Sequence, residues 1–257
     1  MVAKKKKHEL YRKITHSEYK GIKKIGDKGP QSWLPKIISQ LDDVVYKGRM
    51  GYEIVNDEFI KKSPNAHILP QIGGGVALLA IVLYTYFSIK EDSFGEGFDL
   101  FLYFFSWSIL IFFIIYYYTM PKKEIIFNRM EGTVTFPGWM WNKNITMPFD
   151  KIKFSYTTGG PNMIGAYQLQ LVRPDKAGSI LFFPFGAMDC YQELSIITWY
   201  MDKNRPLPPH KDFDLYREKD FQRRKKKKFP KPLYRSRIPT PEATPEQQAE
   251  RERYWKG

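Results

Sequence analysis

The chain has 257 residues, enough for one or two modest domains, and it carries a formal net charge of +14 with 16% aromatic residues. Neither the charge nor the aromatic content is typical of an ordinary soluble enzyme. The single cysteine, Cys190, excludes an intrachain disulfide, and the four scattered histidines lack the spacing of a metal site. The mean hydropathy of −0.45 averages basic, polar ends with a middle segment nearly free of charge.

The first 66 residues form a basic N-terminal region. No apolar stretch follows its opening lysines before Trp33, so we expect no cleaved secretory signal. Apolar residues at helical spacing predict an amphipathic helix over residues 32–46. Its polar face mixes lysine with aspartate, which leaves two placements open, on the membrane surface or against the following domain. Residues 51–60 are predicted to form a short hairpin.

Residues 67–120 are predicted to form a transmembrane hairpin. Two uncharged runs, 68–89 and 100–120, each approach the roughly 20 residues that a helix needs to cross about 30 Å of hydrocarbon. The alternative is a pair of buried core helices, but a chain of this length has little material to cover them. The runs contain no Asp, Glu, Lys, Arg or His, which argues against an ion path and favours an anchor.

Charge asymmetry predicts the orientation of the hairpin. The loop 90–99 holds one lysine and four acidic residues, whereas both flanking regions carry a net positive charge. Lys and Arg are retained on the cytoplasmic side, so both termini should be cytoplasmic, and the membrane is the inner (plasma) membrane if the host is a bacterium.

Residues 121–209 are predicted to form a cytoplasmic β-domain. Alternating or β-branched segments bounded by turn residues predict a series of antiparallel hairpins. The pattern then changes to helical spacing over 190–201, where Asp189 is a candidate N-cap. The predicted strands are 124–129, 133–136, 144–149, 151–156, 167–172 and 179–185.

The order of hairpins followed by one Trp-bearing helix resembles the pleckstrin-homology-like (PH-like) barrel. The motifs Ile125–Gly132, Met147–Asp150, Tyr167–Leu171 and Trp199–Met201 resemble more closely the domain of uncharacterised bacterial two-span inner-membrane proteins, some of which lie beside type VI secretion genes. This resemblance implies an α+β membrane protein in which a two-helix hairpin precedes a PH-like barrel or sandwich with a C-terminal helix. It also implies a role beside toxins, in immunity or as an accessory factor.

Residues 210–257 are predicted to be a basic, Pro-rich and largely extended tail, because they contain few groups to bury. Basic clusters at both ends, and at the exit from the second span, are candidates for binding anionic lipid headgroups, although the alternative is that they only enforce topology or solubility. No fold that reads nucleic acid is recognisable, so we expect no nucleic-acid partner. The candidate lipid-facing residues are Lys4, Lys5, Lys6, Lys7, Lys122, Lys123, Arg223, Arg224, Lys225, Lys226, Lys227 and Lys228.

No catalytic, cofactor-binding or metal-binding motif is recognisable in the sequence. We therefore expect a non-enzymatic, membrane-anchored binding protein with no cofactor, whose partners are anionic lipid and another protein. Two alternatives remain open at this point. One is a subunit of a larger transport or secretion assembly, and the other is a membrane-associated enzyme with an unrecognised site.

Overall fold

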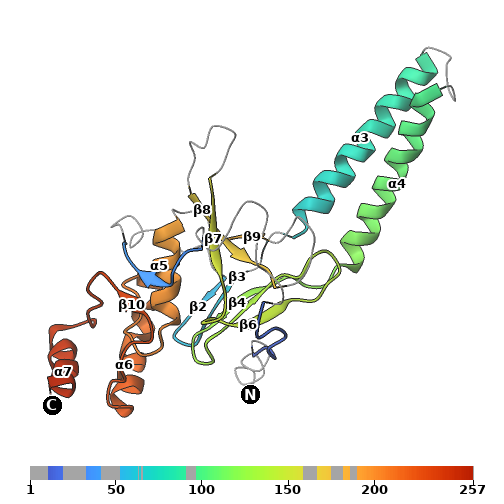
Figure 1. The fold of residues 1–257 in the computed structure, drawn as a ribbon. Coiled ribbons are helices and arrows are strands. Elements are labelled where there is room, and N and C mark those ends of the chain that lie inside the picture. The colour runs from blue at the N-terminus through green and yellow to red at the C-terminus, as the bar shows by residue number, and fades with distance from the viewer. Residues whose placement is uncertain are drawn as a thin grey trace. The chain divides into compact units, whose positions relative to one another are not determined.

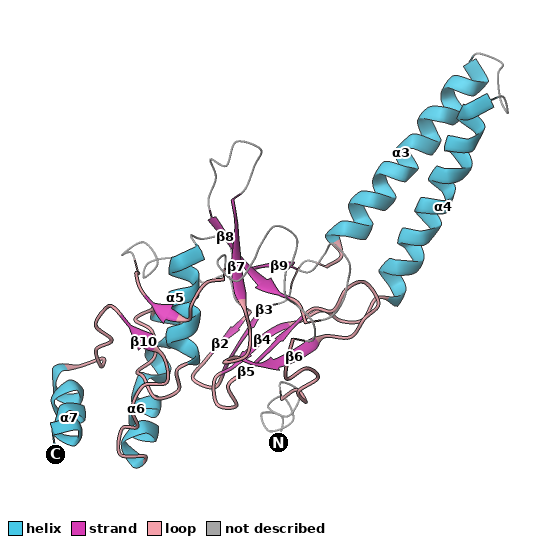
Figure 2. Cartoon of the chain, in the orientation of Figure 1, coloured by secondary structure: helices cyan, strands magenta, loops and turns pink. Residues whose placement is uncertain are grey.

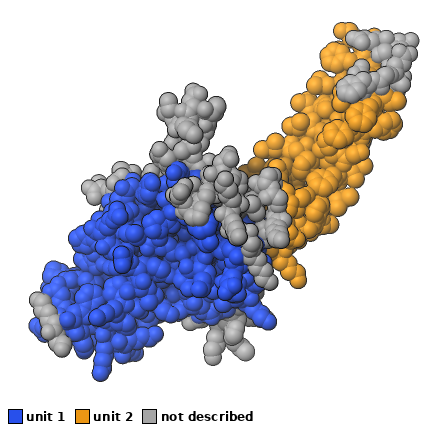
Figure 3. Space-filling view, in the orientation of Figure 1, with its two compact units in different colours: residues 1–62, 124–136, 145–257 blue, residues 63–123, 137–144 orange. Residues whose placement is uncertain are grey.

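The computed structural model describes residues 11–19, 33–41, 53–62, 64, 66–90, 97–158, 167–174, 182–185 and 190–256. The protein is α+β, with two long apolar helices followed in sequence by antiparallel sheet (Figures 1 and 2). It divides into two compact units, coloured separately in Figure 3. A β-rich unit comprises residues 1–62, 124–136 and 145–257, and a helical unit comprises residues 63–123 and 137–144.

The helical unit is an antiparallel hairpin of α3 (Ile68–Lys90) and α4 (Gly97–Thr119). Both helices coincide closely with the two apolar runs that the sequence predicts, and both are long and apolar enough to cross a bilayer. They approach closely at Gly73, where an added Cβ would overlap the ring of Phe113. Glycine at this position therefore lets the two helices pack together.

The loop 137–144 packs on the C-terminal end of α4. The indole of Trp141 lies edge-on to Tyr116, with 5.0 Å between ring centroids, and its Nε1 donates to Thr119 Oγ1 at 2.7 Å. The buried Lys123 Nζ donates to the carbonyl oxygens of Gly138 and Asn142, each at 2.8 Å. Lys123 therefore stabilises the loop. It was predicted to face lipid, but it is buried, because its ammonium group donates to these two backbone carbonyls.

The larger sheet of the β-rich unit has five antiparallel strands in the order β2-β3-β4-β5-β6. Gly132, at φ 66°, closes the tight β4–β5 turn, and Asn128 Oδ1 accepts from the backbone N–H of Glu131. These features confirm the hairpin expected at that place. The strands are β2 (Ile54–Val55), β3 (Phe59–Lys62), β4 (Ile125–Asn128), β5 (Thr133–Phe136) and β6 (Ile145–Pro148).

This sheet corrects the predicted separation of an N-terminal region from the β-domain. The short hairpin expected over 51–60 is present as β2 and β3, and β3 pairs with β4 along its whole length. The chain thus leaves the sheet after β3, forms the helical hairpin, and returns as the next strand. The backbone N–H and C=O groups of β4 need hydrogen-bond partners along both edges of the strand. β5 supplies the partners along one edge, and β3, which precedes the helices in the chain, supplies those along the other.

A second sheet has the order β7-β8-β9, and the helix α5 (Cys190–Met201) follows it in the chain. The helix was expected from its periodicity, and it is buried almost all round. Together with Phe127, Phe136 and Leu171, its residues Leu194 and Ile197 belong to the main hydrophobic core. The strands of this sheet are β7 (Phe154–Thr158), β8 (Tyr167–Val172) and β9 (Phe182–Phe185).

Residues 33–41 are extended, so the described part of the predicted helix 32–46 is not helical, and its remaining residues lie outside the described ranges. We call residues 33–39 the N-terminal strap. Leu34 N–H donates to Phe154 O at 2.8 Å, and Ser39 N–H donates to Ser195 Oγ at 3.0 Å. Between them, β1 (Ile37–Ile38) pairs in parallel with β10 (Arg235–Ser236). Leu34 and Ile38 of the strap are buried through these tertiary contacts, which override the helical period.

The C-terminal segment 210–256 is folded and not largely extended as predicted. It contains a 3₁₀ helix, η2 (Lys211–Tyr216), and two α-helices, α6 (Arg217–Lys226) and α7 (Pro245–Lys256). Phe213 and Phe221 are buried, but they are few among polar residues. The low apolar content therefore did not reveal a segment that also buries several ion pairs.

Candidate functional site

A buried network of charged side chains holds the C-terminal segment to the sheet. Asp220 of α6 accepts from Arg129 Nη1 at 3.0 Å, from Arg223 Nη2 at 2.7 Å and from Arg224 Nε at 2.8 Å. Arg224 also makes a bidentate pair with Glu242, both contacts at 2.7 Å. Arg129 comes from the β4–β5 turn, so the network connects the sheet, α6 and the segment before α7.

The electrostatics of this network are those of a structural core. Burial raises the pKa of Asp220, but the guanidinium groups of Arg129, Arg224 and Arg223 outweigh it and hold that pKa below its ordinary value. Burial lowers the pKa of Arg129, although Asp220 partly opposes this change. The charges are close-packed and paired with one another, so Arg129 and Asp220 face no solvent.

The network divides the predicted basic cluster 223–228 into two sets. Arg224 is buried and is not lipid-facing as predicted, because two carboxylates hold it inside the unit. Arg223 is half-buried on Asp220, and Lys225 pairs with Glu250. Lys226, Lys227 and Lys228 are exposed, as is Lys122 in the other unit, whereas Lys4, Lys5, Lys6 and Lys7 lie outside the described residues.

Lys228 and Lys231 help to line an open depression, which we call the C-terminal groove, and the exposed Lys226 and Lys227 precede it in the chain. The empty space in it is about 1170 Å³, and it is lined by Lys228, Phe229, Pro230, Lys231, Pro232, Tyr254 and Trp255. Trp255 and Tyr254 are 46% and 47% exposed, and Trp255 Nε1 donates to Phe229 O at 3.0 Å. Trp255 thus has a hydrogen-bonded indole nitrogen and a partly exposed ring, and it lies beside lysines. This combination is typical of residues at a membrane–water interface.

The backbone at the start of this groove is strained. Lys228 and Phe229 have φ values of 56° and 45°, a left-handed conformation that side chains other than glycine adopt at a cost. Phe229 N–H donates to Arg224 O at 3.0 Å, and the Phe229 ring packs against Phe221 and Tyr254. Packing of Phe229 thus holds the turn that ends α6 and leaves Lys228 exposed.

A second open depression, the lysine groove, lies in the same unit. Its empty space is about 970 Å³, and it is lined by Trp33, Leu34, Pro35, Lys36, Asp150, Lys151, Ile152, Lys153 and Tyr234. These residues come from the strap, the β6–β7 turn and the segment before β10. Lys151 and Lys153 were predicted to lie in a strand, but they lie in the turn before β7. The sequence does not indicate this groove, because only the fold brings its three segments together.

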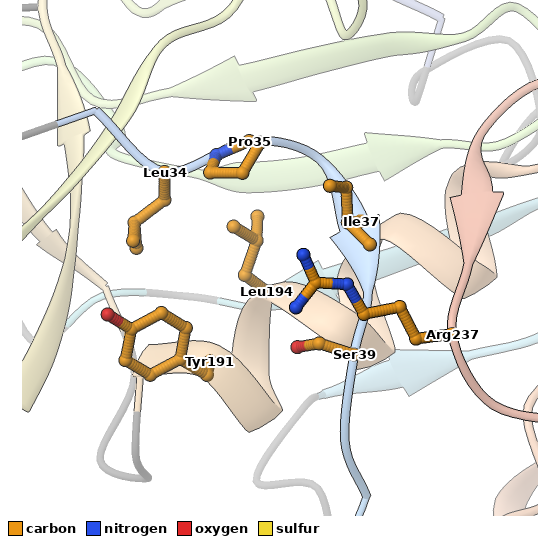
Figure 4. A pocket seen from close by; sticks show the side chains of 7 residues that line it. All are labelled: Leu34, Pro35, Ile37, Ser39, Tyr191, Leu194 and Arg237. Carbon is orange, nitrogen blue, oxygen red and sulfur yellow. The ribbon is translucent and has the colours of Figure 1, made fainter. Parts of the chain in front are cut away.

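A smaller cavity lies between the strap and α5 (Figure 4). Its empty space is about 350 Å³, lined by Leu34, Pro35, Ile37, Ser39, Tyr191, Leu194 and Arg237. These side chains are mostly apolar and surround the space from the strap, from α5 and from the residue after β10. The cavity therefore marks where the strap crosses the helix.

No protein-family model, curated protein or solved structure matches this chain. The features of the described residues that bear on function are the exposed apolar helices, the C-terminal groove and the lysine groove.

Proposed function

We propose that this protein is a non-enzymatic binding protein anchored in a membrane by α3 and α4. The observation that carries the proposal is the exposure of their apolar side chains. Only 17% of the apolar stretch of α3 and 6% of that of α4 is buried within the protein. Leu69, Ile72, Phe101 and Phe104 are each between 58% and 62% exposed. Removing one such side chain from water is worth about 1.5–3 kcal/mol, so a lipid environment is strongly favoured.

The proposed orientation places both termini in the cytoplasm and the acidic loop 90–99 on the opposite side, in the inner membrane of a bacterium. The positive-inside rule supports this arrangement, because basic residues flank the hairpin on both sides. The positions of Trp141, Tyr116 and Tyr117 at one end of the hairpin suit an interfacial aromatic belt.

The β-rich unit would be the binding part of the molecule. The order of two antiparallel sheets followed by α5 supports a PH-like assignment for residues 121–209, with β2 and β3 as an addition. In this proposal the protein is an immunity or accessory factor of a type VI secretion system, and it binds a protein partner and no nucleic acid.

Anionic headgroups are the proposed lipid partner of the C-terminal groove. Lys226, Lys227, Lys228 and Lys231 supply positive charge, and each lysine near an anionic bilayer is worth about 1 kcal/mol. Trp255 adds an exposed ring that suits the headgroup level.

Membrane anchoring is tested by carbonate extraction and by cysteine labelling. The buried Cys190 is first replaced by alanine, and single cysteines are then introduced as Ser93→Cys or Lys211→Cys. An impermeant maleimide applied to intact bacterial cells should label the first variant, whereas the second should react only after lysis. Extraction of the chain by carbonate, or labelling of both variants in intact cells, contradicts the proposal.

Lipid binding by the groove is tested separately in nanodiscs. Hydrogen exchange at the end of α7 should slow in discs that contain phosphatidylserine compared with discs of phosphatidylcholine alone. Exchanging Lys226, Lys227, Lys228 and Lys231 for glutamine should remove the difference, and the single change Lys211→Gln, at an exposed lysine outside this groove, should preserve it. Equal exchange in both lipids would refute this part of the proposal and leave the anchor untouched.

A further inference from the structure

The lysine groove is a built feature, because backbone hydrogen bonds fix its walls. Leu34 N–H donates to Phe154 O at 2.8 Å, which joins the strap to β7. The following residues, Ile37–Ile38, pair with Arg235–Ser236, which places Tyr234 at the other side of the opening. Side chains mounted on such a framework need little reorganisation to receive a ligand.

Two of the three ammonium groups at the groove are held in position. Lys153 Nζ lies 3.8 Å from the centroid of the Trp33 ring and 5.2 Å from that of Tyr19. Lys36 Nζ donates to the backbone oxygen of Asp150 at 2.9 Å and lies 5.5 Å from the Phe149 ring centroid. An ammonium group has three N–H donors, so Lys36 has donors beyond the one that this carbonyl uses.

The charge of the groove favours an anion. Lys36, Lys151 and Lys153 outnumber the one carboxylate, Asp150, among the residues that line it. Burial lowers the pKa of Lys36 to about 8, and Asp150 only partly opposes this change. The protonated Lys36 is therefore short of compensating negative charge, and an incoming carboxylate would supply it.

The same lining favours separated carboxylates over a dense polyanion. The exposed carboxylate of Asp150 stands among the lysines and would repel a polyphosphate or a nucleic-acid backbone. Trp33 and Tyr234 are half-buried and add aromatic surface for apolar parts of a ligand. The depression is open to solvent and spans nine lining residues from three segments, an extent that suits a few residues of a peptide chain.

We propose that the lysine groove is a docking site for an acidic peptide segment of a protein partner. The inference rests on the proposed function in one respect, which is that the β-rich unit binds a protein. Carboxylates of the segment would accept hydrogen bonds from Lys36 and Lys153, and its apolar atoms would pack on Trp33 and Tyr234.

The test uses the full-length protein in phosphatidylcholine nanodiscs and a fluorescein-labelled peptide of alternating glutamate and glycine. Binding is followed by fluorescence anisotropy, with the glutamine–glycine peptide as the reference. We expect the glutamate peptide to bind more tightly, and Lys36→Met and Lys153→Met each to weaken it about tenfold. Lys211→Met removes the same charge at an exposed lysine outside the groove and should leave the affinity unchanged.

A pH series gives a readout that misfolding would not imitate. The peptide binds the protonated form of Lys36 through ionised glutamates, so affinity should be full between about pH 6 and pH 8 and should fall as pH rises through about 8. The groups facing Lys36 are Asp150, Lys151, Lys153 and Tyr234, and burial raises the pKa of Tyr234 to about 12, so its hydroxyl stays neutral there. In Lys36→Met this fall near pH 8 should be absent.

Because Lys36 is half-buried, its replacement can also affect folding, and thermal unfolding of each variant is measured in parallel. Lys151→Met, at an exposed position of the same groove, should weaken binding with no loss of stability. Equal affinity for the glutamate and glutamine peptides overturns the inference, as does tighter binding of inorganic polyphosphate than of the glutamate peptide. If the protein resists carbonate extraction but fails these binding tests, only the proposed peptide-docking role of the lysine groove is refuted. The proposal that α3 and α4 anchor the protein in a membrane is then unaffected.

Discussion

Replacing Asp220 by asparagine should strongly destabilise the β-rich unit. Asp220 is the one carboxylate that pairs with Arg129, Arg223 and Arg224 together in the described structure, at 3.0, 2.7 and 2.8 Å. Asparagine preserves the size of the side chain and removes its negative charge. Arg129, which is fully buried, then loses its ion-pair partner, whereas Arg224 keeps Glu242.

The expected cost follows from this difference between the arginines. Breaking a buried ion pair by removing one partner typically costs about 3–5 kcal/mol, because a charge stays buried without compensation. Asp214→Asn is the matched control, because Asp214 pairs with Arg217 at 2.8 Å but its side chain is 64% exposed. An exposed pair of this kind is worth at most about 1 kcal/mol.

The assay is urea unfolding of the full chain in detergent micelles, followed by near-ultraviolet circular dichroism. The second measurement is hydrogen exchange over α6, which should lose protection in Asp220→Asn and keep it in Asp214→Asn. The double variant Arg129→Met/Asp220→Leu should recover part of the loss, since it removes both buried charges. A change below about 0.5 kcal/mol in Asp220→Asn, within the range of ordinary surface substitutions, would refute the view that this network holds the C-terminal segment.

Three further outcomes follow from the same structure. The pKa of Asp220 in the folded protein lies below its ordinary value of 3.8. The stability that Asp220 contributes is therefore complete above pH 3.8 and is lost as the pH falls through the folded-state pKa. In an acid titration, the Asp220→Asn variant should lose less stability than the natural chain. Gly73→Val should separate α3 from α4, because a Cβ at this position overlaps the Phe113 ring, and disulfide cross-linking between the two helices should therefore fall. Gly75→Val should preserve the cross-linking, because a Cβ added there meets no atom within 4 Å. Lys123→Met should leave two carbonyls without a donor at a cost of about 1–3 kcal/mol and expose the loop 137–144 to protease, whereas Lys143→Met, at an exposed position in the same loop, should not. The first expectation is contradicted if Asp220→Asn and the natural chain lose equal stability in acid, and the second if Gly73→Val leaves the cross-linking unchanged. The third is contradicted if Lys123→Met leaves protease cleavage of the loop unchanged.

Local pattern predicted the two apolar helices, most strands of the two antiparallel sheets and α5. The uncharged runs 68–89 and 100–120 became α3 and α4, and most of the strand patterns after them became strands close to their predicted bounds. The exception is the predicted strand 151–156, because β7 begins only at Phe154 and residues 151–153 lie in the turn before it. The Gly132 turn and the helix 190–201 also followed from short-range signals. Each of these signals is complete within one segment, because length, period and turn chemistry need no knowledge of distant residues.

Tertiary structure alone decided how the ends of the chain are used. Helical spacing over 32–46 predicted a helix, but Leu34 and Ile38 are buried in an extended strap because β7 and β10 offer them partners. Low apolar content predicted an extended tail, but the tail is folded, and Asp220, Arg224 and Glu242 pair inside it. Composition counts these residues only as polar and does not show that they pair. The lysine groove likewise exists only where three distant segments meet. The physical reason is the same in each case. The periodicity of a segment indicates which of its residues can be buried, whereas contacts across the whole fold decide which partner covers an apolar side chain or pairs with a charged one.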